Sequence, residues 1–189
     1  MNEIEKAADL LRKGGLVVYP TDTLYALGAS VSNESAVRNV YEIKKRPLDI
    51  YLPVAVGSVE QIETVAVMND AAKKIAGKFM PGPITLILKK KKGKSDIVAR
   101  DKIAVRVPAD PVALNISSIT GAITATSANV HGMNAPLTVE EAKKQLGDKV
   151  DMYIDGGKLK GIPSTIIDIS DGKIKVIREG AIKAEEFYE

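Results

Sequence analysis

The sequence predicts an α/β domain with a mixed β-sheet, and three observations support this prediction. Amphipathic helical segments and short apolar, β-branched segments alternate along nearly the whole chain. The length of 189 residues lies within the range of one domain and suffices to bury a sizeable core. No internal repeat, low-complexity tract or linker divides the sequence. Residues 1–189 are therefore expected to form a single domain.

The first half of the chain begins with an amphipathic helix. In MNEIEKAADLLRKGG, one helix face carries Ile4, Ala7, Ala8 and Leu11. The strand VVY follows it. The remaining elements predicted for this half are a helix over 34–44, a strand over 51–56 and a helix over 69–79 that Asn69 caps.

The second half adds two strands, PITLILKK and KIAVRVP, which a polar, lysine-rich loop separates. Thr138 and Glu141 are predicted to form the capping box of a helix that extends to Leu146. The other elements predicted here are a helix that starts over 111–116, a short strand GAITAT, and strands over 152–154, 164–169 and 173–177. The C-terminal KAEEFYE is predicted to be either a short last helix or a frayed tail.

The composition excludes several classes of site. The chain has no cysteine, which rules out disulfide frameworks, thiolate zinc sites and cysteine nucleophiles. Its single histidine, His131, cannot form an HExxH pair. The N-terminus carries acidic residues at once, unlike a signal peptide, and no apolar run is long enough to span a bilayer. We therefore expect a soluble, cytoplasmic protein with no membrane partner.

The common phosphate-binding and nucleophile motifs are also absent. Gly93, Lys94 and Ser95 imitate the end of a GxxxxGK[ST] loop, but Leu88 stands where the first glycine belongs. Neither GxGxxG nor GxSxG occurs. A nucleotide must therefore be bound by another kind of cradle.

Positive charge is concentrated in two clusters, although the net charge is only +3. The first, Lys44 to Arg46, lies at a helix C-terminus, where the helix dipole by itself favours cations. The second comprises Lys89, Lys90, Lys91, Lys92 and Lys94. Such a run is either a solvated edge that discourages aggregation or a contact for nucleic-acid phosphates.

Polar side chains gather just beyond the strand VVY. The segment PTDTLYALG places Thr21, Asp22, Thr23 and Tyr25 within five positions. In α/β sheets, ligands bind outside the carboxyl ends of strands, so this cluster is a candidate site. The same residue types also form turns and helix caps.

Eight segments taken in order resemble the YrdC/Sua5 family of L-threonylcarbamoyladenylate synthases. They are PTDTLYALG, KKRP, PGPITLIL, IAVRVP, TSAN, DGG, STIID and IREGAI. The similarity extends from about the first helix to Ile182 and matches the single-domain form of the family. The resemblance implies a YrdC-like fold, which is a twisted, open mixed sheet with flanking helices and a basic concave face.

The resemblance also implies an activity. L-threonine, bicarbonate and ATP would be converted to threonylcarbamoyl-AMP and pyrophosphate. A downstream threonylcarbamoyl transferase complex would then modify adenosine 37 of ANN-reading tRNAs. Mg²⁺ is expected because ATP is normally bound as its magnesium complex, but no carboxylate cage is visible in the sequence, so we assign no metal ligands.

For ATP, the resemblance implies a set of cationic and hydrogen-bonding residues. The reaction brings negative charges together and so requires fixed cations. Lys44 and Arg46 match the family's KxR pair and would hold the triphosphate as the catalytic residues. The further ATP-binding residues implied are Lys102, Ser127, Asn129 and Arg178. Taken singly, these residues also suit helix ends, turns and the protein surface.

For threonine, the resemblance implies a pocket made by Thr23, Arg106 and Ser164. Arg106 lies in the otherwise apolar strand IAVRVP, where a buried guanidinium requires an anionic partner such as the substrate carboxylate. Strand alternation alone also allows Arg106 to lie on the exposed face of an edge strand.

The sequence departs from the family pattern in four places. Many relatives continue after KxRP with DNPL and then a histidine, whereas this chain has Ile50, Tyr51 and Ala55 at the asparagine, proline and histidine positions. These changes put the details of the threonine pocket and one nucleotide contact in doubt. Ala26 replaces a usual glycine and would resist a positive φ there.

Three functions therefore compete. The first is L-threonylcarbamoyladenylate synthesis. The second is binding of tRNA or double-stranded RNA by the same fold without adenylation, and the third is carbamoyl-adenylate chemistry with another acceptor. Nucleotide turnover separates the second from the others, and dependence on threonine separates the first from the third.

Overall fold

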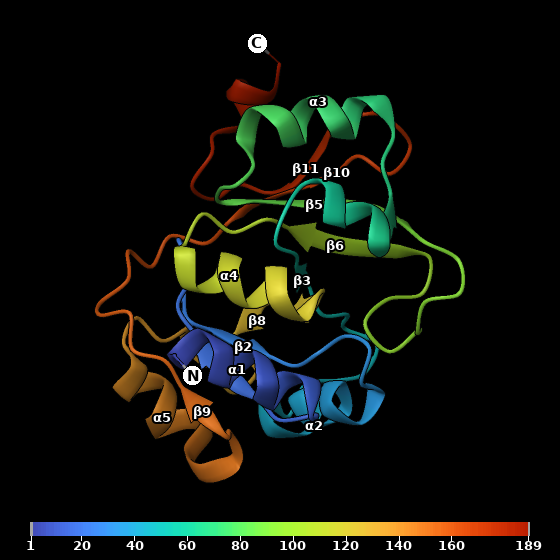
Figure 1. Ribbon diagram of the computed structural model, residues 1–189. Helices are drawn as coiled ribbons and strands as arrows, with labels where there is room; N and C mark the ends of the chain where they lie inside the picture. The colour runs from blue at the N-terminus through green and yellow to red at the C-terminus, as the bar shows by residue number, and fades with distance from the viewer. Residues whose placement is uncertain (1, 189) are drawn as a thin grey trace.

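The computed structural model describes residues 2–188, whose strands form two mixed sheets with helices outside them (Figure 1). In chain order the elements are α1 (Glu3–Arg12), β1 (Val17–Tyr19), β2 (Ala26–Gly28), α2 (Glu34–Lys44), β3 (Val54–Ala55), η1 (Glu60–Thr64), β4 (Ala66–Val67), α3 (Asp70–Phe79), β5 (Ile84–Lys90), β6 (Lys102–Arg106), α4 (Pro111–Thr120), β7 (Ile123–Thr124), β8 (Thr126–Ser127), α5 (Val139–Leu146), η2 (Gly147–Lys149), β9 (Met152–Tyr153), β10 (Thr165–Asp168), β11 (Lys175–Arg178) and η3 (Ala184–Phe187).

The larger sheet has the order β11-β10-β5-β6-β3-β7, with β4 paired to one end of β5. The strands β5 and β6 are antiparallel, as a hairpin with the lysine-rich loop requires. β10 is parallel to β5, and β3 is parallel to β6, so the sheet is mixed. The alternating buried side chains Leu86, Leu88, Ile103 and Val105 hold its centre in the core.

The smaller sheet has the order β8-β2-β1-β9. The predicted mixed α/β fold with flanking helices is confirmed, and the described strands form two mixed sheets. The chain reverses after β1 through residues 20–25 and returns as β2, which pairs antiparallel with β1 instead of joining the larger sheet. An isolated bridge between Ser30 and Ile123 lies where the two sheets meet.

Most predicted helices are confirmed. The helices over 34–44 and 69–79 correspond to α2 and α3, and the Asn69 side chain accepts a hydrogen bond from the Ala72 amide as an N-cap. The helix predicted to start over 111–116 continues to Thr120 and ends at Gly121. The strand predicted over 51–56 shrinks to Val54–Ala55. Residues 51–53 instead leave the sheet and line a cavity.

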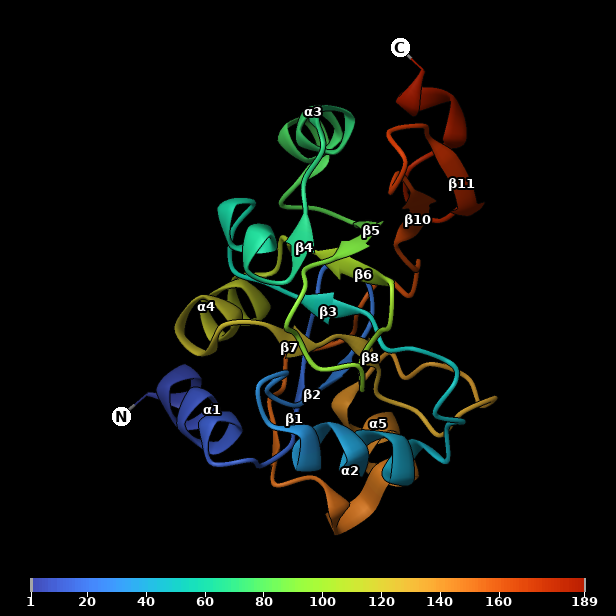
Figure 2. The same ribbon diagram turned by 90° about the vertical axis from the view of Figure 1, so that its right-hand side faces the viewer.

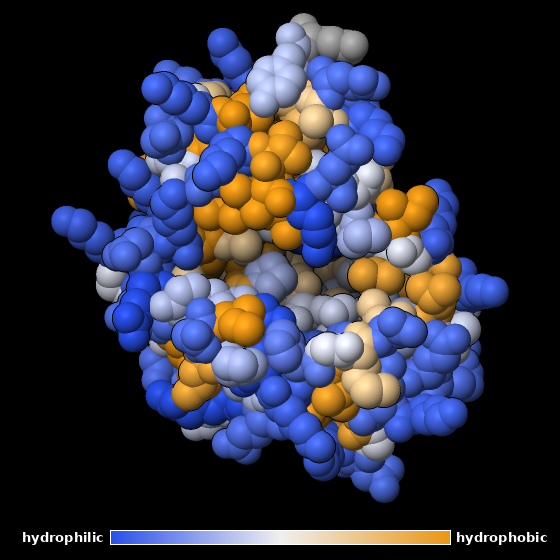
Figure 3. Space-filling model, turned by 180° about the vertical axis from the view of Figure 1, so that it is seen from behind, coloured by the Kyte–Doolittle hydropathy of each residue, from blue (hydrophilic) through white to orange (hydrophobic). Residues whose placement is uncertain are grey.

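The helices leave one face of the molecule open. Helices α1 and α4 pack together on one side, while α3 lies beside the C-terminal η3 through the edge-to-face pair of Phe79 and Phe187 (Figure 2). Seen from the side opposite α1 and α4, the surface has a hollow near its middle (Figure 3). No helix within residues 2–188 is long and apolar enough to cross a membrane.

Candidate active site

A cavity of about 320 Å³ gathers residues from both sheets. Its walls come from the segment before β2, residues 51–53, β5, β6, β8 and the β10–β11 pair. Three guanidinium groups line it, those of Arg46, Arg106 and Arg178, and no acidic side chain is among its lining residues. Thr23, Thr85, Ser127 and Ser164 add hydroxyl groups. The cavity therefore combines net positive charge with short neutral donors.

Arg106 is the most deeply buried of the three arginines, with 6% of its surface exposed. Its strand β6 lies between β5 and β3, so the interpretation as an exposed edge-strand residue is wrong. The Arg106 guanidinium donates to Thr23 Oγ1 at 2.9 Å and to the Gly82 carbonyl at 3.2 Å. Burial lowers the pKa of Arg106 from its ordinary value, although arginine remains charged in proteins.

The anionic partner of Arg106 within the protein is Asp22. Arg106 Nη2 lies 2.7 Å from Asp22 Oδ1, and both side chains are largely buried. From the sequence, a substrate carboxylate is expected in this place, and Asp22 is only part of the polar cluster after the strand VVY. The second Asp22 oxygen and Arg106 Nε are buried without hydrogen-bond partners within the described chain. The PTDT segment thus supplies a negative charge, from Asp22, and a hydroxyl group, from Thr23, to the Arg106 guanidinium.

Ser164 and Arg178 also line the cavity, but Ser164 is buried whereas Arg178 is exposed. Ser164 Oγ lies 2.9 Å from Thr85 Oγ1, and Arg178 Nη2 donates to the Ser164 carbonyl at 2.7 Å. Burial and the charge of Arg106 lower the pKa of Arg178. Two like charges are therefore held near each other, which an anionic ligand between them would stabilise.

Arg46 also lines the cavity, and within residues 2–188 its hydrogen-bond partners are backbone carbonyls. Its Nε donates to the Ile50 carbonyl at 2.8 Å, and its Nη2 donates to the Tyr51 carbonyl at 2.9 Å. These carbonyls orient the guanidinium without neutralising it. Burial lowers the pKa of Arg46 from its ordinary value. Arg46 therefore faces the cavity as an uncompensated cation.

Lys44, which is predicted to hold the triphosphate, is buried and is not among the residues that line the cavity. It is 1% exposed, and Nζ donates to the Ser127 carbonyl at 2.5 Å, the Asn129 carbonyl at 2.6 Å and Asn129 Oδ1 at 3.1 Å. These bonds use all three donors of the ammonium. Burial and the charge of Arg46 lower the pKa of Lys44 to about 7. Lys44 thus lies beneath the TSAN loop and supports it.

The loop that Lys44 supports carries two other predicted ATP residues. Ser127 lines the cavity, and its hydroxyl donates to Asn129 Oδ1 at 2.6 Å. Asn129 is buried away from the cavity lining and donates from Nδ2 to the Met133 carbonyl at 2.5 Å. Only Ser127 of this pair therefore faces the cavity directly.

Lys102 stands apart from the cavity lining. Strand alternation places it on the same face of β6 as Ala104 and Arg106, but nearer to the sheet rim. Its ammonium donates to Asp168 Oδ2 at 2.7 Å, and half of its side-chain surface is exposed. Its predicted ATP contact would therefore be at the outer end of the sheet face.

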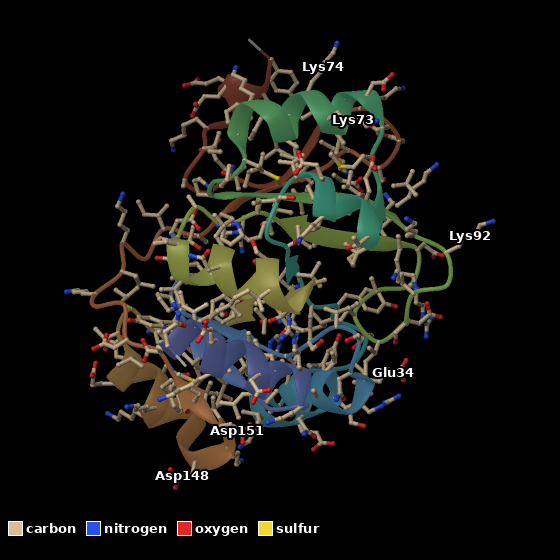
Figure 4. All side chains as sticks on the ribbon, in the orientation of Figure 1. Glu34, Lys73, Lys74, Lys92, Asp148 and Asp151 are labelled. Carbon is tan, nitrogen blue, oxygen red and sulfur yellow. The ribbon has the colours of Figure 1, made fainter. Side chains whose placement is uncertain are left out.

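The lysine-rich loop is partly tied to the protein. Lys90 pairs with Asp96, and Lys91 Nζ donates to the Glu63 carbonyl at 2.8 Å. Lys92 points outward at the side of the molecule (Figure 4). Lys90 and Lys91 therefore help to hold the β5–β6 loop in place.

The departures from the family pattern have distinct positions. Tyr51 lines the cavity, whereas Ala55 is buried in β3 and is not part of the lining. Ala26 lies in β2, and within the described residues the sole non-glycine with positive φ is Lys45. The concern that Ala26 must adopt a positive φ is therefore unfounded.

A family model for Sua5, YciO and YrdC proteins, described as telomere recombination, matches residues 9–180. The chain belongs to this family. A putative threonylcarbamoyl-AMP synthase from Methanocaldococcus jannaschii is 47% identical over 189 residues, which cover 97% of this chain and 90% of that protein.

Two solved structures of family members share the fold. Pyrococcus abyssi Sua5 complexed with L-threonine superposes with a TM-score of 0.92 and 36% identity, over 97% of this chain and 55% of that one. Escherichia coli YciO superposes with a TM-score of 0.89 and 31% identity, over 97% and 92% of the two chains. The present chain thus spans about half of the archaeal Sua5 and nearly all of YciO.

Proposed function

We propose that this protein is an L-threonylcarbamoyl-AMP synthase, a nucleotidyltransferase that forms its product from L-threonine, bicarbonate and ATP. The single observation that carries this proposal is one cavity with three guanidinium groups, eight hydroxyl-bearing residues and no acidic lining residue. Such a cavity suits substrates that carry a carboxylate and phosphates. Relatives named as this synthase support the choice of reaction.

The geometry supports a division of the cavity between the two larger substrates. Threonine would bind at the buried end, with its carboxylate near Arg106 and its hydroxyl near Thr23 or Ser164. The ATP triphosphate would bind toward Arg46 and Arg178, whose charges no lining carboxylate neutralises. This arrangement would bring the threonine amine toward the α-phosphorus of ATP.

The reaction then needs one bond to form and one to break at phosphorus. The threonine amine and bicarbonate give a carbamate with loss of water. A carbamate oxygen attacks the α-phosphorus, and the bond to the β-phosphate oxygen breaks, so pyrophosphate leaves with the electron pair. Arg46 and Arg178 would stabilise the charge that develops on the phosphates. Lys44 would act by fixing the loop of Ser127 and Asn129.

Magnesium would enter as part of the substrate. The cavity lining offers no carboxylate, and residues 2–188 contain no cluster of three or more candidate metal ligands. We therefore propose that Mg²⁺ is carried by the ATP phosphates, where it would offset their charge. A resident metal site is not part of this proposal.

The product is a reactive mixed anhydride, so an acceptor must consume it. We propose that a downstream threonylcarbamoyl transferase complex transfers the group to adenosine 37 of tRNA. The protein would then act in the cytoplasm, where tRNA is modified. The proposal requires no tRNA contact by this chain itself.

An assay of the pure protein tests the proposal. ATP, Mg²⁺ and bicarbonate are incubated with and without threonine, and pyrophosphate is measured together with the mass of the nucleotide product. Pyrophosphate and threonylcarbamoyl-AMP that both require threonine and bicarbonate are expected. Turnover with a different amine or carbamoyl donor would instead establish another acceptor. RNA binding without nucleotide turnover would replace the enzyme proposal.

A further inference from the structure

The strand pair β10–β11 lies at one end of the larger sheet and borders the candidate active site (Figure 2). Its register contains a bulge. Ile166 of β10 is opposite Arg178, whereas the next residue, Ile167, is opposite Val176. Ile177 is therefore an extra residue on β11 without a partner on β10. A bulge of this kind bends its strand and redirects the side chains that follow it.

The bulge decides which way Arg178 points. Val176 packs against the core, and in a regular strand the residue two positions later would point to the same face. Both Ile177 and Arg178 line the cavity instead, because the extra residue shifts the alternation by one position. The guanidinium thereby reaches the Ser164 carbonyl, to which it donates at 2.7 Å. The position of this cation therefore depends on the bulge.

The Thr165 hydroxyl holds the chain just beyond Arg178 in place. Its Oγ1 accepts hydrogen bonds from the amides of Gly180 at 2.9 Å and Ile182 at 3.0 Å, and it donates to the Ile182 carbonyl at 2.6 Å. These bonds use the one donor and both acceptor positions of a hydroxyl group. Thr165 is fully buried, and its amide donates to the Pro83 carbonyl at 3.0 Å. The hydroxyl thus ties the end of β11 to a strand that is itself fixed.

Close backbone packing adds to this attachment. The Ala181 amide donates to the Pro163 carbonyl at 3.0 Å. A β-carbon on Gly180 would lie 2.2 Å from the same carbonyl oxygen, so the segment fits there because this residue is a glycine. Thr165 and Gly180 belong to STIID and IREGAI, two of the segments that resemble the family, yet neither is among the residues that line the cavity. They are therefore placed to fix the segment and not to contact a substrate.

We propose that Thr165 is a positioning residue that fixes the bulge and thereby directs Arg178 into the cavity. The proposal rests on the proposed function, because that function gives Arg178 the phosphates of ATP to bind. Loss of the Thr165 hydroxyl frees residues 180–182, and the guanidinium then loses its fixed direction. The Ser164 hydroxyl keeps its own contact with Thr85 Oγ1, at 2.9 Å, so threonine binding is spared.

Calorimetric titration of ATP and of threonine into single variants tests the proposal. Thr165→Val removes the hydroxyl and keeps the shape of the side chain. It is expected to weaken ATP binding about tenfold or more, as for the loss of one charged hydrogen bond, and to leave threonine binding within about threefold. Thr165→Ser keeps the hydroxyl and should bind ATP within about threefold of the wild type.

Thr124→Val is the matched control. Thr124 is equally buried, its hydroxyl also joins two backbone groups, and it is not among the residues that line the cavity. This variant loses the same chemical group and should become less stable without a change in ATP affinity. Gly180→Ala displaces the same segment as Thr165→Val and carries the test if Thr165→Val does not fold.

A double variant shows whether Thr165 acts through Arg178. In protein that carries Arg178→Ala, the further change Thr165→Val should alter ATP affinity by less than about twofold, because the cation that Thr165 positions is already absent. A merely structural role of Thr165 would weaken ATP binding equally in both backgrounds.

The outcomes separate the positioning role from the proposed function. If the wild type does not bind ATP, the proposed function is wrong and the positioning role fails with it. If the wild type binds ATP and Arg178→Ala weakens that binding, but Thr165→Val and Gly180→Ala resemble Thr124→Val, the positioning role alone is wrong. Equal losses from Thr165→Val with and without Arg178 would also overturn it, as would unchanged ATP binding in Arg178→Ala.

Discussion

The two ends of the main cavity hold their guanidinium groups in different ways. At the buried end, Arg106 is paired with Asp22 and also donates to Thr23. At the open end, Arg46 and Arg178 donate mainly to backbone carbonyls, which carry no net charge. The first end is therefore a nearly neutral, fixed set of donors, and the second retains positive charge. Arginine can thus serve substrate recognition at the end with Arg106 and charge stabilisation at the end with Arg46 and Arg178.

The largest expected effect comes from breaking the buried pair. Arg106→Ala leaves the Asp22 carboxylate buried without its partner, so we expect the free energy of unfolding to fall by about 3–5 kcal/mol. Threonine-dependent turnover should be lost as well. Urea unfolding measures the stability, and the double variant with Asp22→Asn should recover part of it. A stability equal to that of the wild type would contradict the assigned pair.

Loss of a cation at the open end should lower the activity but leave the stability nearly unchanged. Arg46→Ala removes a cation that interacts with no acid, and we expect kcat/KM for ATP to fall by about 10²–10³-fold, as for the loss of one transition-state donor. The free energy of unfolding should change by less than about 1 kcal/mol. Steady-state pyrophosphate release and urea unfolding check the two parts. Arg46→Lys is the matched control and should retain part of the activity because it keeps the charge. Unchanged turnover in Arg46→Ala would remove the phosphate role.

Substitution of Lys44 should lower both turnover and the free energy of unfolding. Lys44→Met leaves the carbonyls of Ser127 and Asn129 without their donor, which should lower the free energy of unfolding by about 1–3 kcal/mol. Turnover should fall because the loop loses its fixed position. Turnover lost with stability unchanged would indicate that Lys44 contacts substrate directly, against its observed position.

The smallest expected effect is a pH dependence of stability. The pKa of Lys44 is lowered to about 7 in the folded protein and is ordinary in the unfolded chain. Below pH 7 the Lys44 side chain is protonated in both the folded and the unfolded protein. Above pH 7 it stays protonated only in the unfolded chain, until the pH reaches its pKa there. The stability of the wild type relative to Lys44→Met should therefore rise between pH 7 and pH 9. A difference that stays constant over this range would show that the pKa is not lowered.

Much of the cavity could be predicted from the resemblance of several segments to the family, and the PTDT cluster also from its place just after a strand. Thr23, Arg106 and Ser164 lie in three separate segments, PTDT, IAVRVP and STIID, and the structure brings all three to one cavity. The boundaries of α2 and α3 were predictable for a local reason, since their caps and apolar faces are encoded within each helix.

The remaining features depend on contacts between distant parts of the chain. The Arg106–Asp22 pair joins residues 84 positions apart, and Lys44 meets Ser127 across 83 positions. Neither contact leaves a local pattern, so a lysine at a helix end looked like a surface cation. The separation into two sheets has the same origin, because strand periodicity fixes which face is buried but not which strand becomes the neighbour.

The division of the cavity is tested most directly by binding measurements on two variants. Threonine and ATP are titrated separately into wild type, Arg46→Ala and Ser164→Ala by calorimetry. We predict that Arg46→Ala weakens ATP binding by about tenfold or more and keeps threonine binding, because it removes a charged contact worth about 1.5–3 kcal/mol. Ser164→Ala should weaken threonine binding by about two- to tenfold and keep ATP binding, because it removes one neutral hydrogen bond worth about 0.5–1.5 kcal/mol. If either variant loses both ligands to the same extent, the two ends of the cavity do not have separate roles.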